Sequence, residues 1–246
     1  MRKWNFKVIL AGDGAVGKTS IRERYMGKGF QGDYLKTIGA DFATKKMEID
    51  EDQITYQIWD LAGQDSYQAV RKTFYKGATA AIMVFDCQDP KSMTNLTSWI
   101  NEAIEGSDNG ILSYFVVANK VDLEESRRVS RDMSLEFCNR LEIETGIRFF
   151  YCETSALTGQ NIQETFDFLA YRLLLANNIQ NATPPKDIDG IIDIKEVMES
   201  TKVVEATESQ GTVSSEAFNK LVDRIDKLED KMNTMQTILK QIVQKL

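Results

Sequence analysis

Histidine is absent from this chain of 246 residues, and cysteine and proline occur only three times each. Without histidine, acid–base catalysis by imidazole and most zinc chemistry are excluded, so any bound metal should be a hard cation held by oxygen atoms. Cys87, Cys138 and Cys152 lie far apart in apolar surroundings. We expect them to be reduced core residues and not a disulfide framework.

Long apolar runs and an excess of positive charge are also missing. No stretch approaches the roughly 18 apolar residues of a membrane span, and the apolar run near the N-terminus is too short for a secretory signal. The net charge is −7, and no basic stripe stands out, which argues against a nucleic-acid partner. We expect a cytoplasmic protein, with a peripheral position on a membrane through partners as an open alternative.

What the chain does contain is a glycine-rich turn between an apolar run and a helical pattern. Gly12-Asp-Gly-Ala-Val-Gly-Lys18-Thr19 follows Val8–Ala11 and has the P-loop spacing Gly-x4-Gly-Lys-[Ser/Thr]. Such a loop turns successive backbone N–H groups toward phosphate oxygens at the positive end of a helix. Lys18 is expected to reach the outer phosphates and the Thr19 hydroxyl to ligate Mg²⁺. The pattern therefore predicts a nucleoside polyphosphate ligand.

Up to about residue 176, apolar runs alternate with amphipathic segments. Strands are expected at Phe6–Ala11, Ala40–Ile49, Gln53–Leu61, Thr79–Asp86, Tyr114–Asn119 and Arg148–Glu153, and helices after Lys18 and at Gln68–Tyr75, Met93–Ile104, Met133–Leu141 and Ile162–Leu175. The second and third strands, joined by a tight turn, are expected to form an antiparallel hairpin. The alternation predicts an α/β three-layer sandwich around a mostly parallel six-stranded sheet, with ligands beyond the carboxyl ends of the strands.

The composition changes after residue 176. Residues 177–216 contain Pro184 and Pro185, are acidic and have no aromatic residue, which predicts a flexible linker. Its apolar residues leave open a second possibility, which is docking on the domain or a short helix. These residues are Ile188, Ile191, Ile192, Ile194 and Val197.

The last segment, 217–246, has apolar residues at alternating spacings of three and four. They are Phe218, Leu221, Ile225, Leu228, Met232, Met235, Leu239, Ile242 and Leu246. This is the repeat of a coiled coil, so a homodimer or a helical partner is expected through this segment. The alternatives are an amphipathic helix that packs on its own domain or on a membrane surface. Three regions are thus expected: 1–176, 177–216 and 217–246.

Two further motifs follow core strands and indicate the base. Asn119-Lys-Val-Asp122 closes one strand, and Glu153-Thr-Ser-Ala156 follows the last one. The Asp122 carboxylate could accept hydrogen bonds from N1–H and the 2-amino group of guanine, which adenine lacks, so the pairing would select GTP over ATP. The Ala156 N–H would face the guanine O6. A solvated turn is the plain alternative for Asn-Lys-x-Asp alone.

Asp60-Leu-Ala-Gly63-Gln64 follows the third strand. Asp60 is placed to hold Mg²⁺ through water, the Gly63 N–H to contact a γ-phosphate, and Gln64 to orient an attacking water. Thr37, between the first helix and the second strand, is expected to give a second hydroxyl ligand to Mg²⁺. No arginine stands in the loop before Thr37, so slow hydrolysis that depends on an activating partner is expected.

Together these motifs, in this order over about residues 5–176, resemble a small GTPase of the Ras superfamily. Lys36–Phe42, Tyr56–Asp60 and Phe74–Ala78 are most similar to the Rab family. The resemblance implies GTP and GDP as ligands with Mg²⁺, effectors that contact residues 30–42 and 62–76, and GTPase-activating and nucleotide-exchange proteins. It also implies that Phe30 stacks on the guanine and that Tyr34 closes over the phosphates.

The expected site combines the motifs and the resemblance. The catalytic residues are Lys18, Gly63 and Gln64, and the metal ligands are Thr19, Thr37 and Asp60. The nucleotide-binding residues are Gly12, Gly14, Ala15, Val16, Gly17, Lys18, Thr19, Ser20, Phe30, Tyr34, Thr37, Asn119, Lys120, Asp122, Leu123, Ser155, Ala156 and Leu157.

Three departures from the family pattern stand out. Leu157 replaces the usual lysine beside the base, and Leu61 and Asp65 replace the usual Thr and Glu around Ala-Gly-Gln. The chain ends in Val-Gln-Lys-Leu246 without a nearby cysteine, so no prenyl anchor is expected. Two other functions remain open: a P-loop enzyme that acts on ATP or a small substrate, such as a kinase, and a coiled-coil scaffold whose assembly is timed by nucleotide.

Overall fold

The computed structural model of the chain describes residues 1–29, 37–185 and 190–197, apart from the side chain of Asp65. These residues fall within one unit, Met1–Val197. Several predicted features lie outside the described residues. They are Phe30, Tyr34, the expected linker at 186–189 and from 198 onward, and the expected coiled coil at 217–246.

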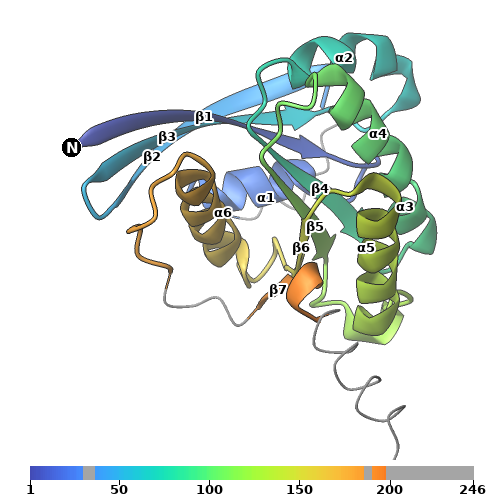
Figure 1. The fold of residues 1–246 in the computed structure, drawn as a ribbon. Coiled ribbons are helices and arrows are strands. Elements are labelled where there is room, and N and C mark those ends of the chain that lie inside the picture. The colour runs from blue at the N-terminus through green and yellow to red at the C-terminus, as the bar shows by residue number, and fades with distance from the viewer. Residues whose placement is uncertain (30–36, 186–189, 198–246) are drawn as a thin grey trace, which may run out of the picture. The chain divides into compact units, whose positions relative to one another are not determined.

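The strands form one mixed sheet in the order β2-β3-β1-β4-β5-β6-β7 (Figure 1). Their bounds are β1 Arg2–Ala11, β2 Ala40–Ile49, β3 Asp52–Leu61, β4 Ala80–Asp86, β5 Ser113–Asn119, β6 Phe149–Glu153 and β7 Ile191–Asp193. Strand β1 pairs in parallel with β3 and β4, and β5 pairs in parallel with β4 and β6. Strand β2 is antiparallel to β3, as the predicted hairpin requires.

The prediction of six strands is wrong, because residues 191–193 form a seventh; of the two possibilities left open after residue 176, docking on the domain holds for residues 191–197. Strand β7 pairs antiparallel with β6, and residues 194–197 form a helical turn. Asp193 accepts two hydrogen bonds from the Arg148 guanidinium, which lies 45 residues earlier in the chain, and Ile194 is 1% exposed. A three-residue strand carries too little alternation to be recognised, and its partners are distant in sequence, so local pattern could not reveal it.

The helices are α1 Lys18–Tyr25, α2 Gln68–Tyr75, α3 Pro90–Thr94, α4 Leu96–Gly106, α5 Arg131–Thr145 and α6 Ile162–Ala176, with single 3₁₀ turns at Asp65–Tyr67 and Glu124–Ser126. The single helix predicted at 93–104 is instead two helices that meet at Asn95. Asp89 accepts a hydrogen bond from the Lys91 N–H, and Pro90 occupies the first turn, so α3 has its own cap.

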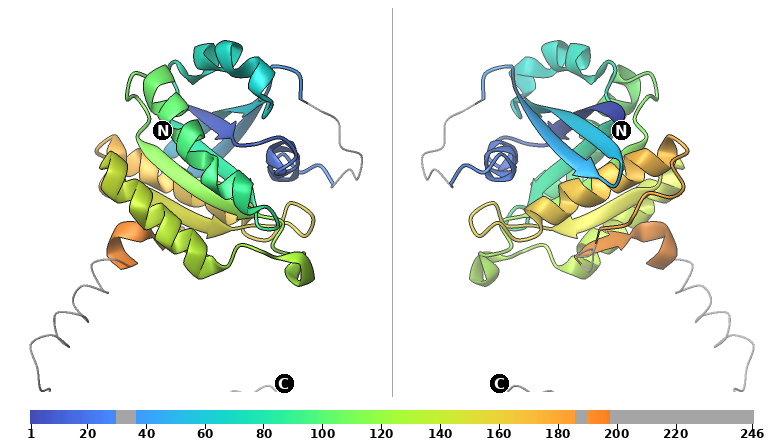
Figure 2. Two further views of the ribbon diagram at one scale, coloured as in Figure 1. Left: turned by 90° about the vertical axis from the view of Figure 1, so that its right-hand side faces the viewer. Right: turned by 90° about the vertical axis from the view of Figure 1, so that its left-hand side faces the viewer.

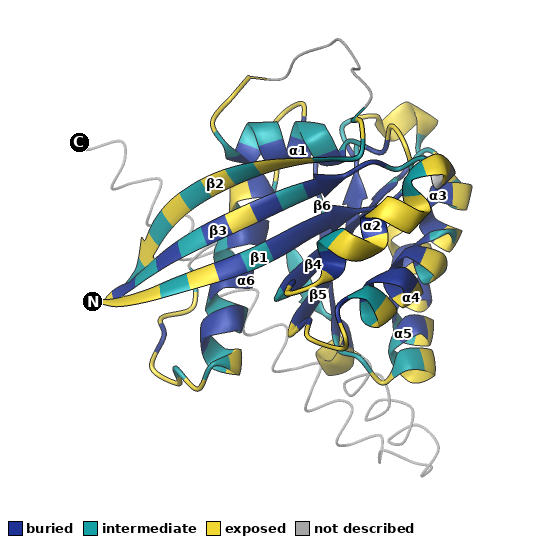
Figure 3. Ribbon diagram, turned by 90° about the horizontal axis from the view of Figure 1, so that it is seen from above, coloured by how far each residue is buried: buried dark blue, intermediate teal, exposed yellow. Residues whose placement is uncertain are grey.

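Helices α1 and α6 cover one face of the sheet, and α2 to α5 cover the other (Figure 2). On the first face, the Tyr25 and Phe166 rings stack with centroids 3.8 Å apart, against a core of alternate residues from β1, β3, β4 and β5. Strand β4 is buried on both faces, as is usual for the interior of a parallel sheet. The edge strand β2 has no fully buried residue (Figure 3).

Replacement of Ile194 by alanine tests whether the segment around β7 belongs to the folded domain. Because this side chain is almost fully buried, we expect Ile194→Ala to lower the free energy of unfolding by about 2–5 kcal/mol. Ile143 is 76% exposed, so Ile143→Ala should change the free energy of unfolding by less than about 0.5 kcal/mol. Urea unfolding measures both, and equal effects would contradict the docked position of residues 191–197.

Candidate functional site

The loop between β1 and α1 is shaped by its close approach to two neighbouring strands. Gly12 and Gly17 have φ of 138° and 100°. A Cβ at Gly12 would lie 2.1 Å from the Val84 carbonyl oxygen of β4, and one at Gly17 would lie 2.2 Å from the Asn119 Nδ2 of β5. Both positions therefore require glycine twice over, for the backbone conformation and for the space.

Lys18 folds back over this loop. Its Nζ donates to the carbonyl oxygens of Gly12 at 2.7 Å and Asp13 at 2.6 Å, and the residue is 5% exposed. Burial lowers the pKa of Lys18 to about 8, while the Asp60 carboxylate acts in the opposite direction. The ammonium group is thus enclosed by a loop whose next residues, Gly14 and Ala15, are exposed.

Two hydroxyl groups and one carboxylate meet beside Lys18. Thr19 Oγ1 donates to Asp60 Oδ2 at 2.5 Å, and Thr37 Oγ1 lies 3.1 Å from Thr19 Oγ1 and 3.5 Å from Asp60 Oδ2. Asp60 is the penultimate residue of β3 with 0% exposure, and its buried Oδ1 has no hydrogen-bond partner. Burial raises the pKa of Asp60.

These atoms fit a small hard cation. Mg²⁺ prefers oxygen ligands and usually keeps waters or phosphate oxygens beside one or two protein ligands. The unpartnered buried Oδ1 of Asp60 and the two hydroxyls supply such a partial set. Within the described ranges, no cluster of three or more cysteine, aspartate or glutamate side chains offers an all-protein metal site.

Gly63 and Gln64 lie against the glycine-rich loop. A Cβ at Gly63 would be 2.4 Å from backbone atoms of Asp13 and Gly14, so the chain after β3 contacts the loop backbone directly. The Gln64 Oε1 is buried and has no hydrogen-bond partner. The Gln64 carbonyl oxygen accepts a hydrogen bond of 2.6 Å from Arg71 Nη1.

Asn119, at the end of β5, bonds to two other loops from a position that is 1% exposed. Its Nδ2 donates to the Val16 carbonyl oxygen at 2.9 Å. Its Oδ1 accepts from Thr154 Oγ1 and from the Ala156 N–H, both at 3.2 Å. Ser155 Oγ donates to Asp122 Oδ1 at 2.5 Å, which fixes the Asp122 carboxylate beside the loop after β6.

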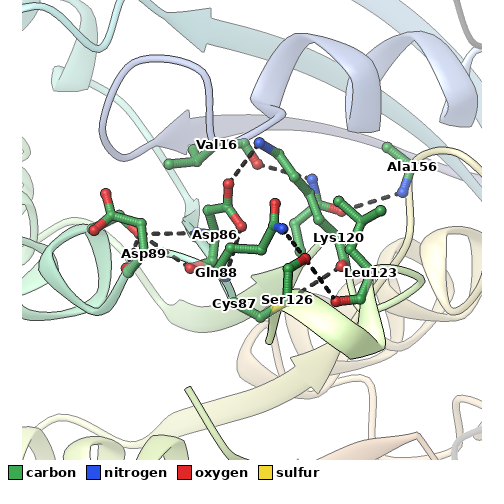
Figure 4. A network of polar contacts seen from close by, with 11 residues as sticks. Val16, Asp86, Cys87, Gln88, Asp89, Lys120, Leu123, Ser126 and Ala156 are labelled. Atoms are coloured by element: carbon green, nitrogen blue, oxygen red, sulfur yellow. Dashed lines mark hydrogen bonds and ion pairs between the residues drawn. The ribbon is translucent and has the colours of Figure 1, made fainter. Parts of the chain in front are cut away.

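Lys120 follows Asn119 with a positive φ of 67°. Its Nζ pairs with Asp86 Oδ2 at 2.6 Å, and its carbonyl oxygen lies 3.2 Å from Cys87 Sγ (Figure 4). Leu123 and Leu157 are 41% and 49% exposed at the same end of the sheet. The positive φ of Lys120 and its ion pair with Asp86 together direct the Lys120 side chain toward Asp86.

The structure brings most of the predicted site residues to the carboxyl edge of the sheet. The residues that lie there are those of the glycine-rich loop, Ser20 on α1, Thr37, Asp60, Gly63, Gln64, and residues 119–123 and 155–157. Phe30 and Tyr34 are outside the described residues. The sequence reasoning missed Asp13, Arg71 and Asp86; only the position of Asp86 at the end of a core strand could have indicated it.

Comparison with known proteins identifies the family. A family model described as the Ras family matches residues 7–175. The chain belongs to the Ras family. As such it is a small GTPase, which confirms the predicted resemblance and fold class. The predicted reduced state of the cysteines is consistent with the structure, because Cys87, Cys138 and Cys152 are free and buried.

The relatives of this Ras-family chain are of the Rab type. It is 40% identical over 177 residues to the Ypt/Rab-type GTPase ypt7 of Pyricularia oryzae, covering 70% of this chain and 84% of that protein. It is 40% identical over 181 residues to ypt7 of Schizosaccharomyces pombe, covering 72% and 85%. Over 187 residues it is 35% identical to the Ras-related protein Rab-13 of Bos taurus, covering 75% and 89%. No helix among the described residues combines the length and apolarity needed to cross a membrane.

Proposed function

We propose that this Rab-like GTPase is a switch that binds GTP or GDP with Mg²⁺ and slowly hydrolyses GTP, with a role in vesicle trafficking or a similar membrane or cytoskeletal process. The observation that supports this most strongly is that Lys18, Asp60 and Asn119 are all buried at the carboxyl edge of the sheet. The names of its Ypt and Rab relatives support the trafficking part.

The phosphate end of the nucleotide would lie along the loop from Gly12 to Thr19. Its amides and the Lys18 ammonium would bind phosphate oxygens, and Ser20 follows on the helix. Thr19, Thr37 and Asp60 would hold Mg²⁺; bound there, the ion would neutralise charge on the β- and γ-phosphates. The unpartnered Asp60 Oδ1 supports this assignment.

The guanine base would lie between the loop after β5 and the loop after β6. The Asp122 carboxylate, held by Ser155 Oγ at 2.5 Å, would accept N1–H and the 2-amino group. The Ala156 N–H would share its bond between Asn119 and the guanine O6. The Lys120 stem, Leu123 and Leu157 would flank the ring, with Leu157 giving an apolar edge.

Hydrolysis would depend on position and electrostatics. The Gln64 Oε1, which has no hydrogen-bond partner, would orient the attacking water, the Gly63 N–H would contact the γ-phosphate, and Lys18 would neutralise charge. Because no arginine stands in the loop before Thr37, an activating protein would supply one, typically worth about 10³–10⁵ in rate.

Loss of the γ-phosphate would release residues 30–42 and 62–76, and effectors would recognise the difference. The described part of this surface includes exposed apolar side chains: Ile38, Phe42 and Val70 are 79%, 52% and 49% exposed. Exposed apolar side chains of this kind gather at protein interfaces. Nucleotide-exchange proteins would act on the same segments.

The heptad pattern of residues 217–246 favours a homodimer or a helical partner. We propose that a linker connects this segment to the folded domain. We also propose that the protein is cytoplasmic and reaches membranes through its partners. The second candidate function is a scaffold in which the nucleotide times coiled-coil assembly.

Replacement of Gln64 by leucine tests the switch. We expect Gln64→Leu to keep GTP and GDP affinity and to reduce single-turnover hydrolysis by about tenfold or more, since a water-orienting group is lost. Gln163→Leu, on the exposed surface of α6, is the matched control and should hydrolyse GTP normally. Unreduced hydrolysis by Gln64→Leu would refute the role of Gln64.

Replacement of Asp122 by asparagine tests the base. The amide would donate where guanine also donates, so GTP affinity should fall by at least about 10²-fold while xanthosine triphosphate binds better. Asp132→Asn, at an exposed position on α5, should leave the affinities for GTP and for xanthosine triphosphate unchanged. Competition with a fluorescent GDP analogue measures the affinities. Effective competition by ATP on the unchanged protein would instead favour a P-loop kinase or another ATP enzyme.

The molar mass in solution tests the tail. Light scattering of the full chain, loaded with GDP and then with a non-hydrolysable GTP analogue, should give two or more chains, and residues 1–197 alone should be monomeric. This shortened chain keeps β7, which belongs to the domain. A mass that depends on nucleotide would favour the scaffold, and a monomer in both states would refute self-association.

A further inference from the structure

Arg71 is a buried cation on the largely exposed helix α2. Along α2, the five residues from Gln68 to Thr73 other than Arg71 are exposed, whereas Arg71 is 3% exposed. A buried arginine requires partners for its charge and its donors. Those partners lie in two places that the proposed mechanism does not connect.

The first partner is α4, which holds the guanidinium in place and in plane. Arg71 Nε donates to Glu102 Oε1 at 2.9 Å, and Nη2 donates to Glu102 Oε2 at 3.1 Å. The guanidinium carbon lies 4.1 Å from the centre of the Trp99 ring. A two-point carboxylate pair on one side and an aromatic face on another leave the group little freedom.

The second partner is the backbone that carries Gln64. Arg71 Nη1 donates to the Gln64 carbonyl oxygen at 2.6 Å and to the Ala62 carbonyl oxygen at 3.2 Å. These two carbonyls flank Gly63. One rigid donor therefore holds both ends of the three-residue segment that presents the Gly63 N–H and the Gln64 side chain.

The same face of α4 also holds the glycine-rich loop. Trp99 Nε1 donates to Asp13 Oδ1 at 2.8 Å, and Asn95 Nδ2 donates to Asp13 Oδ2 at 2.7 Å. Asn95, Trp99 and Glu102 follow one another at spacings of four and three, which places them on one side of a helix. Helix α4 and the residue before it thus form a common support for the loop and for residues 62–64.

We propose that Arg71 is a positioning residue for GTP hydrolysis, which uses α4 as a fixed support to hold Ala62–Gln64 against the glycine-rich loop. The inference rests on the proposed role of Gln64 as the group that orients water. Since a displacement of about 1 Å at a reacting centre can cost about 10²-fold in rate, a rigid hold on the Gln64 backbone has a direct kinetic consequence. Arg71 acts through Gln64 and contacts no reacting atom.

The experiment replaces the ion pair as a unit. Arg71→Ala alone would leave the Glu102 charge buried without a partner, and such a variant can fail to fold. The double variant Arg71→Met with Glu102→Leu keeps the volume of the pair, which proteins usually tolerate, and removes the donors to Ala62 and Gln64. We expect single-turnover GTP hydrolysis to fall by about tenfold or more, with GDP and GTP affinities within about threefold of the unchanged protein.

A second ion pair between the same two helices gives the control. Lys72 Nζ lies 3.4 Å from Glu105 Oε2, with side chains 53% and 69% exposed. Glu105→Gln removes this pair without touching residues 62–64, so hydrolysis should be unchanged. A fall equal to that of the Arg71–Glu102 replacement would show that any weakening of the α2–α4 contact slows hydrolysis, and it would overturn the inference.

Combination with Gln64→Leu separates positioning from a structural role. If Arg71 acts through Gln64, the pair replacement should slow the unchanged protein and have no further effect on the Gln64→Leu background. Equal falls on both backgrounds, or a fall matched by weaker nucleotide binding, would overturn the inference. Full hydrolysis by Gln64→Leu alone would refute the proposed function instead, so the two failures are distinguishable.

Discussion

The close packing of the glycine-rich loop against the ends of β4 and β5 is the constraint on which the rest of the site depends. Gly12 lies against the Val84 carbonyl and Gly17 against Asn119, so the loop has no room for side chains at these positions. This packing sets where α1 begins. It thereby buries Lys18 and brings Thr19 to Asp60.

A second consequence of this packing is that Asn119 belongs to both halves of the site. The same side chain that limits Gly17 also donates to Val16 and accepts from the loop after β6. The proposed phosphate side and the proposed base side are therefore joined through one buried amide. A buried polar group without a partner is costly. A displacement of either loop would therefore break a hydrogen bond of Asn119 and destabilise the position of the other loop.

Two unpartnered buried atoms lie at the proposed phosphate side of the site. Asp60 Oδ1 and Gln64 Oε1 both lack a hydrogen-bond partner, whereas Lys18 and Thr19 beside them are paired. Arg71 is the clearest contrast, because its partners include a carboxylate, an aromatic ring and two carbonyl oxygens. Pairing fixes the backbone, while in the function we propose the unpaired oxygens would serve a cation and a water.

The sequence by itself determined strands β1 to β6, the loop motifs, the resemblance to the family and guanine as the expected base, because each of these depends on short-range spacing. The pairing of β7 with β6 and the division of the helix at Asn95 were decided by the tertiary structure. So was the Asp13–Trp99–Arg71–Glu102 cluster: Asp13 and Trp99 are 86 residues apart, and Arg71 and Glu102 are 31 apart. No local pattern encodes such contacts, because they arise only when the sheet places its loops and helices side by side.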